Sequence, residues 1–271
     1  MPLGEIIGQD KVIAVLKGIA ESGRLQGGFL FSGPEGVGKK LVAVSLAKII
    51  NCQKAEFESC EICPSCLKIN KGSHPDIHII SLEDNELIKI EQVRQLQKDI
   101  YLRAYEAKIK VFIIDNAHNL TAEASNALLK VLEEPPKMSL IILISSKPRL
   151  LFKTIVSRCR PVKFSSMPRH DLKRILESKH NLSAADAHFL AYFSEGRIGY
   201  AMRNKDGDIV KERQKILDSF LGMNVSVKDS YDISERQDFS RALDILALWF
   251  RDIYLLKAGI DESELANIDR R

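Results

Sequence analysis

The chain has 271 residues, 45% of them hydrophobic and 28% charged, which is the composition of a soluble globular protein. Its longest apolar run is too short to span a bilayer and its N-terminus lacks the basic and apolar regions of a secretory signal, so we expect a cytoplasmic protein. The net charge of +4 is only mildly basic, but its distribution is uneven.

The first half of the chain alternates between two apolar patterns. Some stretches repeat apolar residues at helical spacing and end at Gly or Pro, and others are short runs rich in β-branched residues. This alternation predicts an α/β fold in which a parallel sheet has helices on both faces. The predicted helices cover 10–23, 40–51, 90–104 and 121–136, the last capped by Thr121, and the predicted strands cover 28–33, 76–82, 108–115 and 139–146.

The first strand leads into the loop GPEGVGKK at 33–40, which nearly matches the phosphate-binding pattern G-x-x-x-x-G-K-[ST]. Gly33, Gly38 and Lys39 fit the pattern, and Gly36 lies between them. Glycines allow backbone N–H groups to converge on phosphate oxygens. The last position needs a hydroxyl to bind Mg²⁺, but it is Lys40, whose ammonium has no lone pair for a metal. We therefore expect a degenerate nucleotide site, where ATP binding stays open and hydrolysis is not expected.

The strand that ends at Asp115 would form the second half of an ATPase site. Asp115 could face a metal ion there, but the next residue, Asn116, replaces the carboxylate that orients the attacking water. An amide cannot accept that proton. The defects at Lys40 and Asn116 together favour an inactive site, although Asn116 alone could be an ordinary loop residue.

Four of the five cysteines lie within fifteen residues, at Cys52, Cys60, Cys63 and Cys66. The spacing C-x₇-C-x₂-C-x₂-C is typical of a Cys₄ zinc site, and four protein ligands leave no open coordination position. We predict a structural Zn²⁺ ion rather than four independent thiols. Cys159 stands alone and is expected to be a core residue.

The strands are expected to stop after about residue 164, and the remaining chain has helical patterns, with a linker at 205–208. Lys and Arg gather at 137–174, where ten of them stand against one acid, Asp171. Such a run is usually a solvated surface, but it could also meet phosphates.

Several of these stretches together resemble the AAA+ subunits of the bacterial clamp loader of DNA polymerase III. The resemblance rests on IIGQDKVIAVLKG (6–18), the loop, the cysteine insertion after the loop helix, NALLKVLEEPP (126–136) and SRC (157–159), and it covers about residues 5–255. It implies an AAA+ P-loop domain with a zinc module at 1–165, a small helical lid at 166–205 and a helical collar at 206–271. The collar is short, so we expect either a compact or a truncated one.

The resemblance also implies roles for individual residues. The arginine of SRC, Arg158, would reach the ATP of a neighbouring subunit as an arginine finger, while Ser145 and Ser146 stand where the family has its first sensor. Gly199 replaces the arginine that senses a subunit's own nucleotide in active members, and Arg197 lies two positions too early. These departures favour a subunit that does not hydrolyse ATP. The implied partners are the gamma/tau and delta subunits of a hetero-oligomeric ring, the sliding clamp, and primed DNA.

Two alternatives stay open at the level of the sequence. The chain could be an active ATPase of the gamma/tau type with unusual site residues, and Lys40 together with Asn116 argues against that. It could also be a zinc-knuckle protein that binds nucleic acid and keeps a vestigial P-loop. The knuckle lacks interleaved aromatic residues apart from Phe57, so base stacking is poorly supported.

Overall fold

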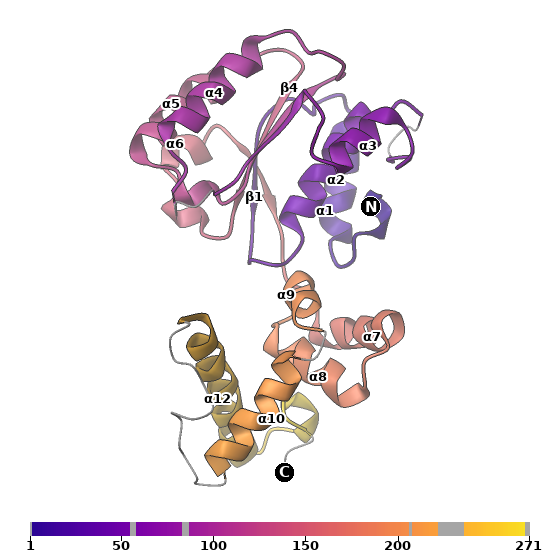
Figure 1. Ribbon diagram of the computed structural model, residues 1–271, viewed down its shortest axis with the longest axis vertical. Helices are drawn as coiled ribbons and strands as arrows, with labels where there is room; N and C mark the ends of the chain where they lie inside the picture. Colours follow the sequence, from indigo (N-terminus) through magenta and orange to yellow (C-terminus); the bar gives the residue numbers. More distant parts are fainter. Residues whose placement is uncertain (1, 55–57, 83–86, 206–207, 222–235, 269–271) are drawn as a thin grey trace. The chain divides into compact units, whose positions relative to one another are not determined.

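The computed structural model describes residues 2–54, 58–82, 87–205, 208–221 and 236–268. The chain forms two compact units, Met1–Ser165 and Ser166–Arg271. The first is an α/β unit, and every described element of the second is a helix (Figure 1). The predicted linker at 205–208 includes 206–207, which lie outside the described residues, and the cysteine segment includes 55–57, which do so as well. The division of the helical unit into lid and collar therefore stays a prediction.

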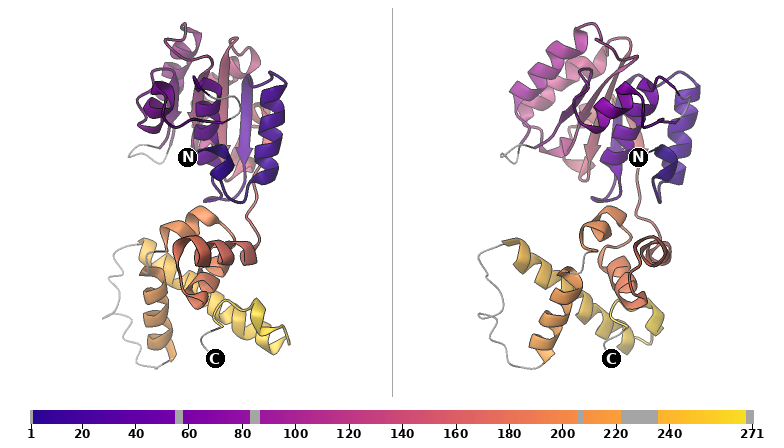
Figure 2. Two further views of the ribbon diagram at one scale, coloured as in Figure 1. Left: turned by 90° about the vertical axis from the view of Figure 1, so that its right-hand side faces the viewer. Right: turned by 45° about the vertical axis from the view of Figure 1, so that its right-hand side comes forward.

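Five parallel strands form the sheet of the α/β unit in the order β2-β3-β4-β1-β5. Parallel strands need crossover connections, and in this unit those are helices (Figure 2). The α/β class and the four predicted strands are confirmed. The strands are β1 (Gly27–Ser32), β2 (Ile77–Ile80), β3 (Lys110–Ile114), β4 (Ser139–Ser145) and β5 (Arg160–Lys163).

Successive residues of each strand bury their side chains on opposite faces of the sheet. On one face, Phe29 and Phe31 of β1 join a core with residues of α1 and α2, and on the other face Leu30 joins residues of α4, α5 and α6. Both faces are covered, which explains the unbroken apolar runs of the central strands. The helices are α1 (Asp10–Glu21), α2 (Lys39–Asn51), α3 (Pro64–Asn70), α4 (Ile90–Tyr101), α5 (Ala122–Glu133) and α6 (Lys153–Val156).

The ends of α5 follow the local sequence. The Thr121 hydroxyl accepts a hydrogen bond from the N–H of Ala124 at 3.2 Å, which confirms the predicted N-cap. The helix ends at Glu133, just before Pro135 and Pro136, because proline cannot continue the hydrogen-bond ladder.

The sequence did not reveal β5. Its four residues contain Pro161 and only one buried position, Val162, and such a stretch has little strand character by itself. As an edge strand β5 pairs only with β1, so the missing N–H of Pro161 can be tolerated. Pairing with β1, and not local propensity, makes this segment a strand.

The helical unit is built around contacts of α7 with α8 and of α10 with α12. Its core includes Leu172, Leu176 and Phe189, and the guanidinium of Arg213 lies 4.4 Å from the centre of the Phe189 ring. Among the described residues, no helix is long and apolar enough to cross a membrane. The helices are α7 (Arg169–His180), α8 (Ala184–Phe193), α9 (Ile198–Arg203), α10 (Asp208–Leu221) and α12 (Arg236–Lys257).

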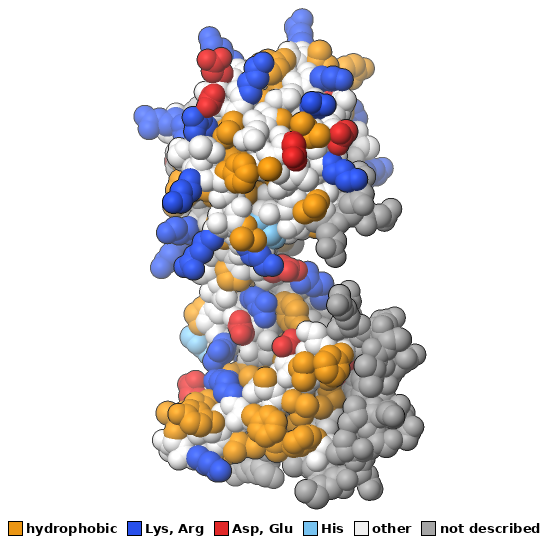
Figure 3. All heavy atoms as spheres, turned by 90° about the vertical axis from the view of Figure 1, so that its left-hand side faces the viewer, with side chains coloured by type: hydrophobic (Ala, Val, Ile, Leu, Met, Phe, Trp, Pro, Cys, Tyr) orange, Lys and Arg blue, Asp and Glu red, His pale blue; other side chains and the backbone are white. Residues whose placement is uncertain are grey.

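One face of α12 leaves large apolar side chains in solvent. Phe239, Leu243, Phe250 and Tyr254 are each at least half exposed, and their spacing places them on one side of the helix. We call these four residues the α12 stripe. Figure 3 shows hydrophobic side chains gathered on the surface of the helical unit. An exposed apolar surface of this kind is typical of a site that another protein covers.

Candidate functional site

The loop at 33–40 connects the end of β1 to the start of α2. Gly33, Gly36 and Gly38 have φ angles of 149°, 78° and 95°, a region that favours glycine, and Gly38 is the N-cap residue of α2. The start of a helix leaves several N–H groups without intrahelical partners. The loop therefore keeps the backbone shape expected for a phosphate-binding loop.

Replacing Gly33 by alanine should destabilise the α/β unit by about 2 kcal/mol or more. A Cβ atom at Gly33 would lie 2.3 Å from the carbonyl oxygen of Phe164, and the backbone there has a positive φ. The measurement is urea unfolding. Gly18→Ala is the control, since its Cβ would meet open space on α1 and should raise the stability slightly. Equal midpoints for Gly33→Ala and the unmodified chain would contradict the loop geometry.

Lys39 turns its ammonium group back into the loop. It is buried, and its Nζ donates hydrogen bonds to the carbonyl oxygens of Gly33 at 2.7 Å and Pro34 at 2.6 Å. Burial lowers the pKa of Lys39, while the negative charges of Glu35 and Asp115 act in the opposite direction. The predicted phosphate-binding lysine is thus held inside the loop by two backbone carbonyls.

Lys40 lies beside Asp115, and this contact links the two sequence departures. The Nζ atom of Lys40 is 3.1 Å from Oδ2 of Asp115, at the end of β3. The Lys40 ammonium forms an ion pair with the Asp115 carboxylate and neutralises the charge of that carboxylate. The carboxylate is then less available to a metal ion. Asn116 adopts a left-handed backbone with φ 53° and donates its N–H to the Asp115 carboxylate at 3.1 Å.

Ser145 ends β4 next to the loop and is fully buried. Its Oγ lies 3.3 Å from Nδ1 of His118 and accepts the N–H of Lys147 at 3.1 Å. Burial, followed by the charges of Lys147 and Lys39, lowers the pKa of His118. Ser146 follows directly and is half-buried. His118 was not identified from the sequence, because nothing in its local pattern indicates that it meets Ser145.

The sheet topology explains why these residues meet. The carboxyl ends of β3, β4 and β1, which are neighbours in the sheet, carry Asp115, Ser145 and the loop. The N–H of Gly33 donates to the carbonyl of Ser145 at 3.3 Å. Ligand sites of parallel sheets lie at this edge. The structure therefore brings the predicted loop residues, Asp115 and Ser145 together.

Arg158 lies near the amino ends of the strands, whereas the loop lies at their carboxyl ends. Arg158 precedes β5, whose Arg160 pairs with Phe29 near the start of β1, whereas the loop follows the end of β1. At about 3.3 Å per residue along β1, the two ends of the strands are roughly 16 Å apart. The guanidinium is partly exposed, pairs with Glu133 at 2.7 Å and donates to the carbonyl of Thr154 at 3.0 Å. Arg158 is thus not part of the chain's own loop site.

The four clustered cysteines meet as their spacing predicts. Their Sγ atoms all lie within 4.8 Å of one another, and Cys52, Cys63 and Cys66 are buried. The N–H of Cys63 donates to Sγ of Cys60 at 3.3 Å, and the N–H of Cys66 donates to Sγ of Cys63 at 3.5 Å. A tetrahedral metal with bonds of about 2.3 Å needs sulfur atoms about 3.8 Å apart, so the cluster could hold a metal ion.

The pKa values of two cluster thiols are shifted in opposite directions. Burial raises the pKa of the Cys66 thiol to about 12, whereas for Cys63 burial is outweighed by hydrogen bonds from Gln53 and Cys66, which lower its pKa. A bound cation stabilises the thiolate form. Cys159 lies outside the cluster and is buried in the core of the α/β unit, as expected.

A buried ion pair attaches the cysteine segment to the loop helix. Lys48, on α2, is only 1% exposed, and its Nζ lies 2.6 Å from Oε1 of Glu61, which has a left-handed backbone between two of the cysteines. Burial would raise the pKa of Glu61, but hydrogen bonds from Lys48, Ser59 and Asn70 outweigh it and lower the pKa. The candidate metal module is therefore fixed to the helix that begins at the loop.

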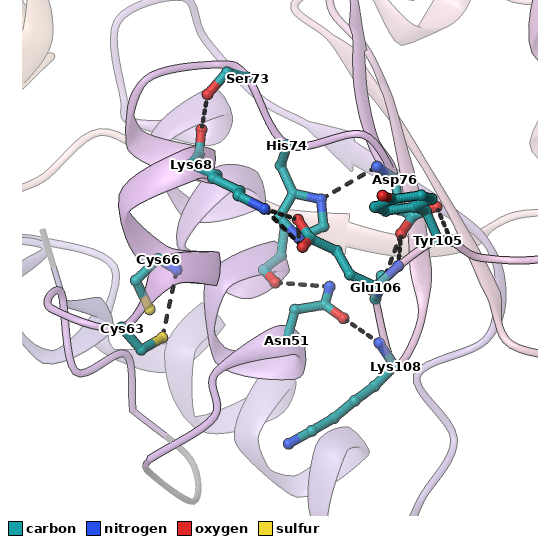
Figure 4. Close-up of polar contacts among 12 residues, drawn as sticks. Asn51, Cys63, Cys66, Lys68, Ser73, His74, Asp76, Tyr105, Glu106 and Lys108 are labelled. Atoms are coloured by element: carbon teal, nitrogen blue, oxygen red, sulfur yellow. Dashed lines mark hydrogen bonds and ion pairs between the residues drawn. The ribbon is translucent and has the colours of Figure 1, made fainter.

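Two further buried side chains fix the segment that leads into β3 (Figure 4). The Asp76 carboxylate accepts N–H groups of Tyr105, Glu106 and Ala107 at 2.8–2.9 Å. Asn51, the last residue of α2, accepts the N–H of Lys108 at 2.8 Å. Asp76 thus joins the segment before β2, and Asn51 joins the end of α2, to the chain that leads into β3.

Comparisons of the sequence with known proteins point to subunits of DNA polymerase III. Residues 8–168 match the family described as "DNA polymerase III, delta subunit". The chain is 30% identical over 264 residues to DNA polymerase III subunit delta' of Bacillus subtilis, covering 94% of this chain and 79% of that protein. It is 33% identical over 208 residues to DNA polymerase III subunit tau of Escherichia coli, covering 74% of this chain but only 32% of that protein.

Solved structures show a similar fold. A gamma subunit-related protein of DNA polymerase III from Thermotoga maritima has a TM-score of 0.50 at 19% identity, covering 75% of this chain and 62% of that one. A point mutant of Thermotoga maritima RuvB has a TM-score of 0.51 at 17% identity, covering 98% of this chain and 87% of that one. At these identities the likeness concerns the fold alone.

Proposed function

Because this chain belongs to the family of DNA polymerase III clamp-loader subunits, we propose that it is the delta-prime type of subunit, which does not hydrolyse ATP. The observation that carries this proposal is the contact of Lys40 with Asp115 at 3.1 Å. A cation from the protein stands beside the carboxylate where an active site would place Mg²⁺. With an amide at Asn116 as well, both the hydroxyl that would bind Mg²⁺ and the water-orienting carboxylate are replaced.

In this function the chain scaffolds a hetero-oligomeric ring with gamma/tau and delta subunits, which loads the sliding clamp onto primed DNA. Arg158 serves the ATP site of a neighbour in trans. Arg158 lies at the end of the strands away from the chain's own loop, and its guanidinium is partly exposed. Both features support that role. A guanidinium supplied by another subunit stabilises the charge that develops on the γ-phosphate.

The cysteine cluster is proposed to hold a structural Zn²⁺ ion through Cys52, Cys60, Cys63 and Cys66. Zinc bound by four thiolates has no open position, and it stabilises the fold rather than a reaction. Through Lys48 and Glu61 it would also brace α2.

The first test is ATP hydrolysis by the isolated chain. We expect no turnover above the background, because no described residue replaces the missing Mg²⁺ ligand and water-orienting carboxylate. Two observations favour the alternative of an active gamma/tau-type ATPase. The chain is similar to tau subunits, and it keeps Lys39 and Ser145. Substantial turnover by the isolated chain would decide for that alternative.

Lys40→Thr should make nucleotide binding depend on Mg²⁺. The substitution frees Asp115 and restores the hydroxyl ligand, so Mg²⁺ should tighten binding of a fluorescent ATP analogue by at least about tenfold. The unmodified chain should respond little to Mg²⁺ or EDTA. Hydrolysis should stay absent in Lys40→Thr because Asn116 is unchanged. Equal responses to Mg²⁺ in both proteins would contradict the role given to Lys40.

The α12 stripe is proposed to be part of the surface that joins the ring. Tyr254→Asp combined with Leu243→Asp should weaken assembly by about 30-fold or more, since buried aromatic anchors at interfaces contribute about 2 kcal/mol or more. Both residues are exposed, so the isolated chain should stay folded. Leu256→Asp, also exposed but on another side of α12, is the matched control. The measurement is analytical ultracentrifugation of the reconstituted complex, and an unchanged complex would exclude this surface.

A further inference from the structure

The helical unit contains a cavity of about 340 Å³, separate from the loop and the cysteine cluster. It is formed by the start of α7, the segment from the end of α8 into α9, and α12. The proposed function gives it no role. Its lining combines three arginines with aromatic and apolar side chains and two acids: Arg169, Tyr192, Phe193, Glu195, Arg197, Tyr200, Asp244, Ala247, Leu248 and Arg251.

Aromatic rings hold the arginines in place. The guanidinium carbon of Arg169 lies 4.7 Å from the centre of the Tyr192 ring, and that of Arg197 lies 4.8 Å from the Tyr200 ring. Arg251 approaches Tyr192 from α12 at 5.9 Å. A guanidinium stacked on a ring keeps its N–H groups free at its edge and loses little further freedom when it binds a carboxylate. The cavity thus presents preformed donors.

The donors are only partly used within the described part of the chain. Arg169 contacts the Tyr192 ring but makes no side-chain hydrogen bond or ion pair there. Arg197 donates through Nε to the carbonyl of Ser194 and lies 3.9 Å from Glu195. Arg251 is 3.7 Å from Asp252, but that carboxylate already accepts the N–H groups of Ala266 and Asn267. The lining therefore contains three arginines and two acids. Within the described residues, Glu195 pairs with Arg197, and Asp244 pairs with none of the three arginines.

We propose that this cavity binds a short acidic peptide segment of a partner protein, with a carboxylate on Arg169 and Arg251 and an apolar side chain against Phe193 and Leu248. Arginine forks match carboxylates in shape and charge. The two acids of the lining can accept peptide N–H groups, which a polyphosphate does not offer. A stacked nucleobase is disfavoured as well, because the Tyr192 ring is buried and lies beneath two arginines.

The test is fluorescence anisotropy of the full chain with a fluorescein-labelled peptide, Asp-Glu-Leu-Asp-Phe, and with a matched peptide carrying Lys in place of each acid. The acidic peptide should bind and the basic one should not, and added salt should weaken binding. Arg169→Ala with Arg251→Ala should reduce the affinity at least tenfold, since hydrogen bonds to charged groups are the strong ones. Arg169→Ala alone, at a side chain without a hydrogen bond, should reduce it while preserving the fold.

Arg174→Ala is the matched control, because it removes the same charge from α7 outside the cavity, and it should bind the peptide normally. Three results would overturn the proposal. These are no binding of the acidic peptide up to about 1 mM, an equal loss in Arg174→Ala, and displacement of the peptide by pyrophosphate at lower concentration than by unlabelled peptide. The last would assign the cavity to phosphate anions. None of these results depends on ATP hydrolysis, so the proposed function is tested separately.

Discussion

Arg158→Ala should slow ATP hydrolysis at the adjoining site of the assembled clamp loader by about 10³-fold or more, the effect of removing an arginine finger. The chain's own fold should be unaffected, because the guanidinium is partly exposed and its contacts are an ion pair with Glu133 and exposed hydrogen bonds to the Thr154 carbonyl and the Ser157 hydroxyl. Single-turnover hydrolysis is the measurement, in complexes whose other ATP sites are inactivated.

Two variants separate the finger from a general effect of charge. Arg158→Lys keeps the charge but loses the planar fork, and it should recover little of the rate. Arg160→Ala removes a neighbouring arginine whose guanidinium donates to the carbonyl of Arg24, and it should leave hydrolysis near normal. If Arg158→Ala hydrolysed ATP and loaded clamps like the unmodified complex, the proposed role in trans would be wrong.

Cys66→Ser should release the metal ion and unfold the cysteine module. Structural zinc sites contribute about 10–16 kcal/mol of binding free energy, and a folded site of this kind depends on it. We expect less than one equivalent of zinc by elemental analysis and a clear fall in the melting temperature. A chelator should reproduce the effect in the unmodified chain.

The control for this prediction is Cys159→Ser, which alters a buried cysteine of the same unit outside the cluster. It should keep its zinc, although the buried hydroxyl lowers stability. A full equivalent of zinc in Cys66→Ser, or none in the unmodified chain, would contradict a Cys₄ zinc site.

Acid should weaken the module in two ways. Protons compete with the metal for thiolates, so metal affinity falls with pH. The pKa of Glu61 is lowered in the folded chain. The contribution of Glu61 to the free energy of unfolding is therefore fully present above the unfolded pKa of a glutamate, about 4.3, and is lost as the pH falls below that value. Both effects have the same sign, and the second is confined to lower pH.

Much of the α/β unit could be predicted because its signals are local. Consecutive apolar residues marked the central strands, and the cap at Thr121 and the prolines after α5 marked a helix. The cysteine spacing likewise predicted a cluster, because its members are close in sequence. By contrast, β5 forms through pairing with β1, and its own sequence carries little indication of a strand.

The contacts of the candidate site were harder to predict because they join distant segments. Lys40 and Asp115 were two separate departures in the sequence, and their ion pair follows from the order of β3, β4 and β1 in the sheet. The same holds for His118 with Ser145. The cavity of the helical unit needs side chains from α7 and α12, which no pattern connects.

The attachments of α2 have a consequence for hydrogen exchange. Lys40 holds its first turn to the end of β3, Lys48 holds its middle to Glu61, and Asn51 holds its last turn to the segment before β3. Because its middle and its last turn are held by buried side chains, we expect the amides of these turns to exchange with solvent only when the surrounding unit opens, whereas the first-turn amides, which lack intrahelical partners, exchange faster. We therefore expect protection along α2 to rise from the turn next to the nucleotide loop toward Lys48 and Asn51.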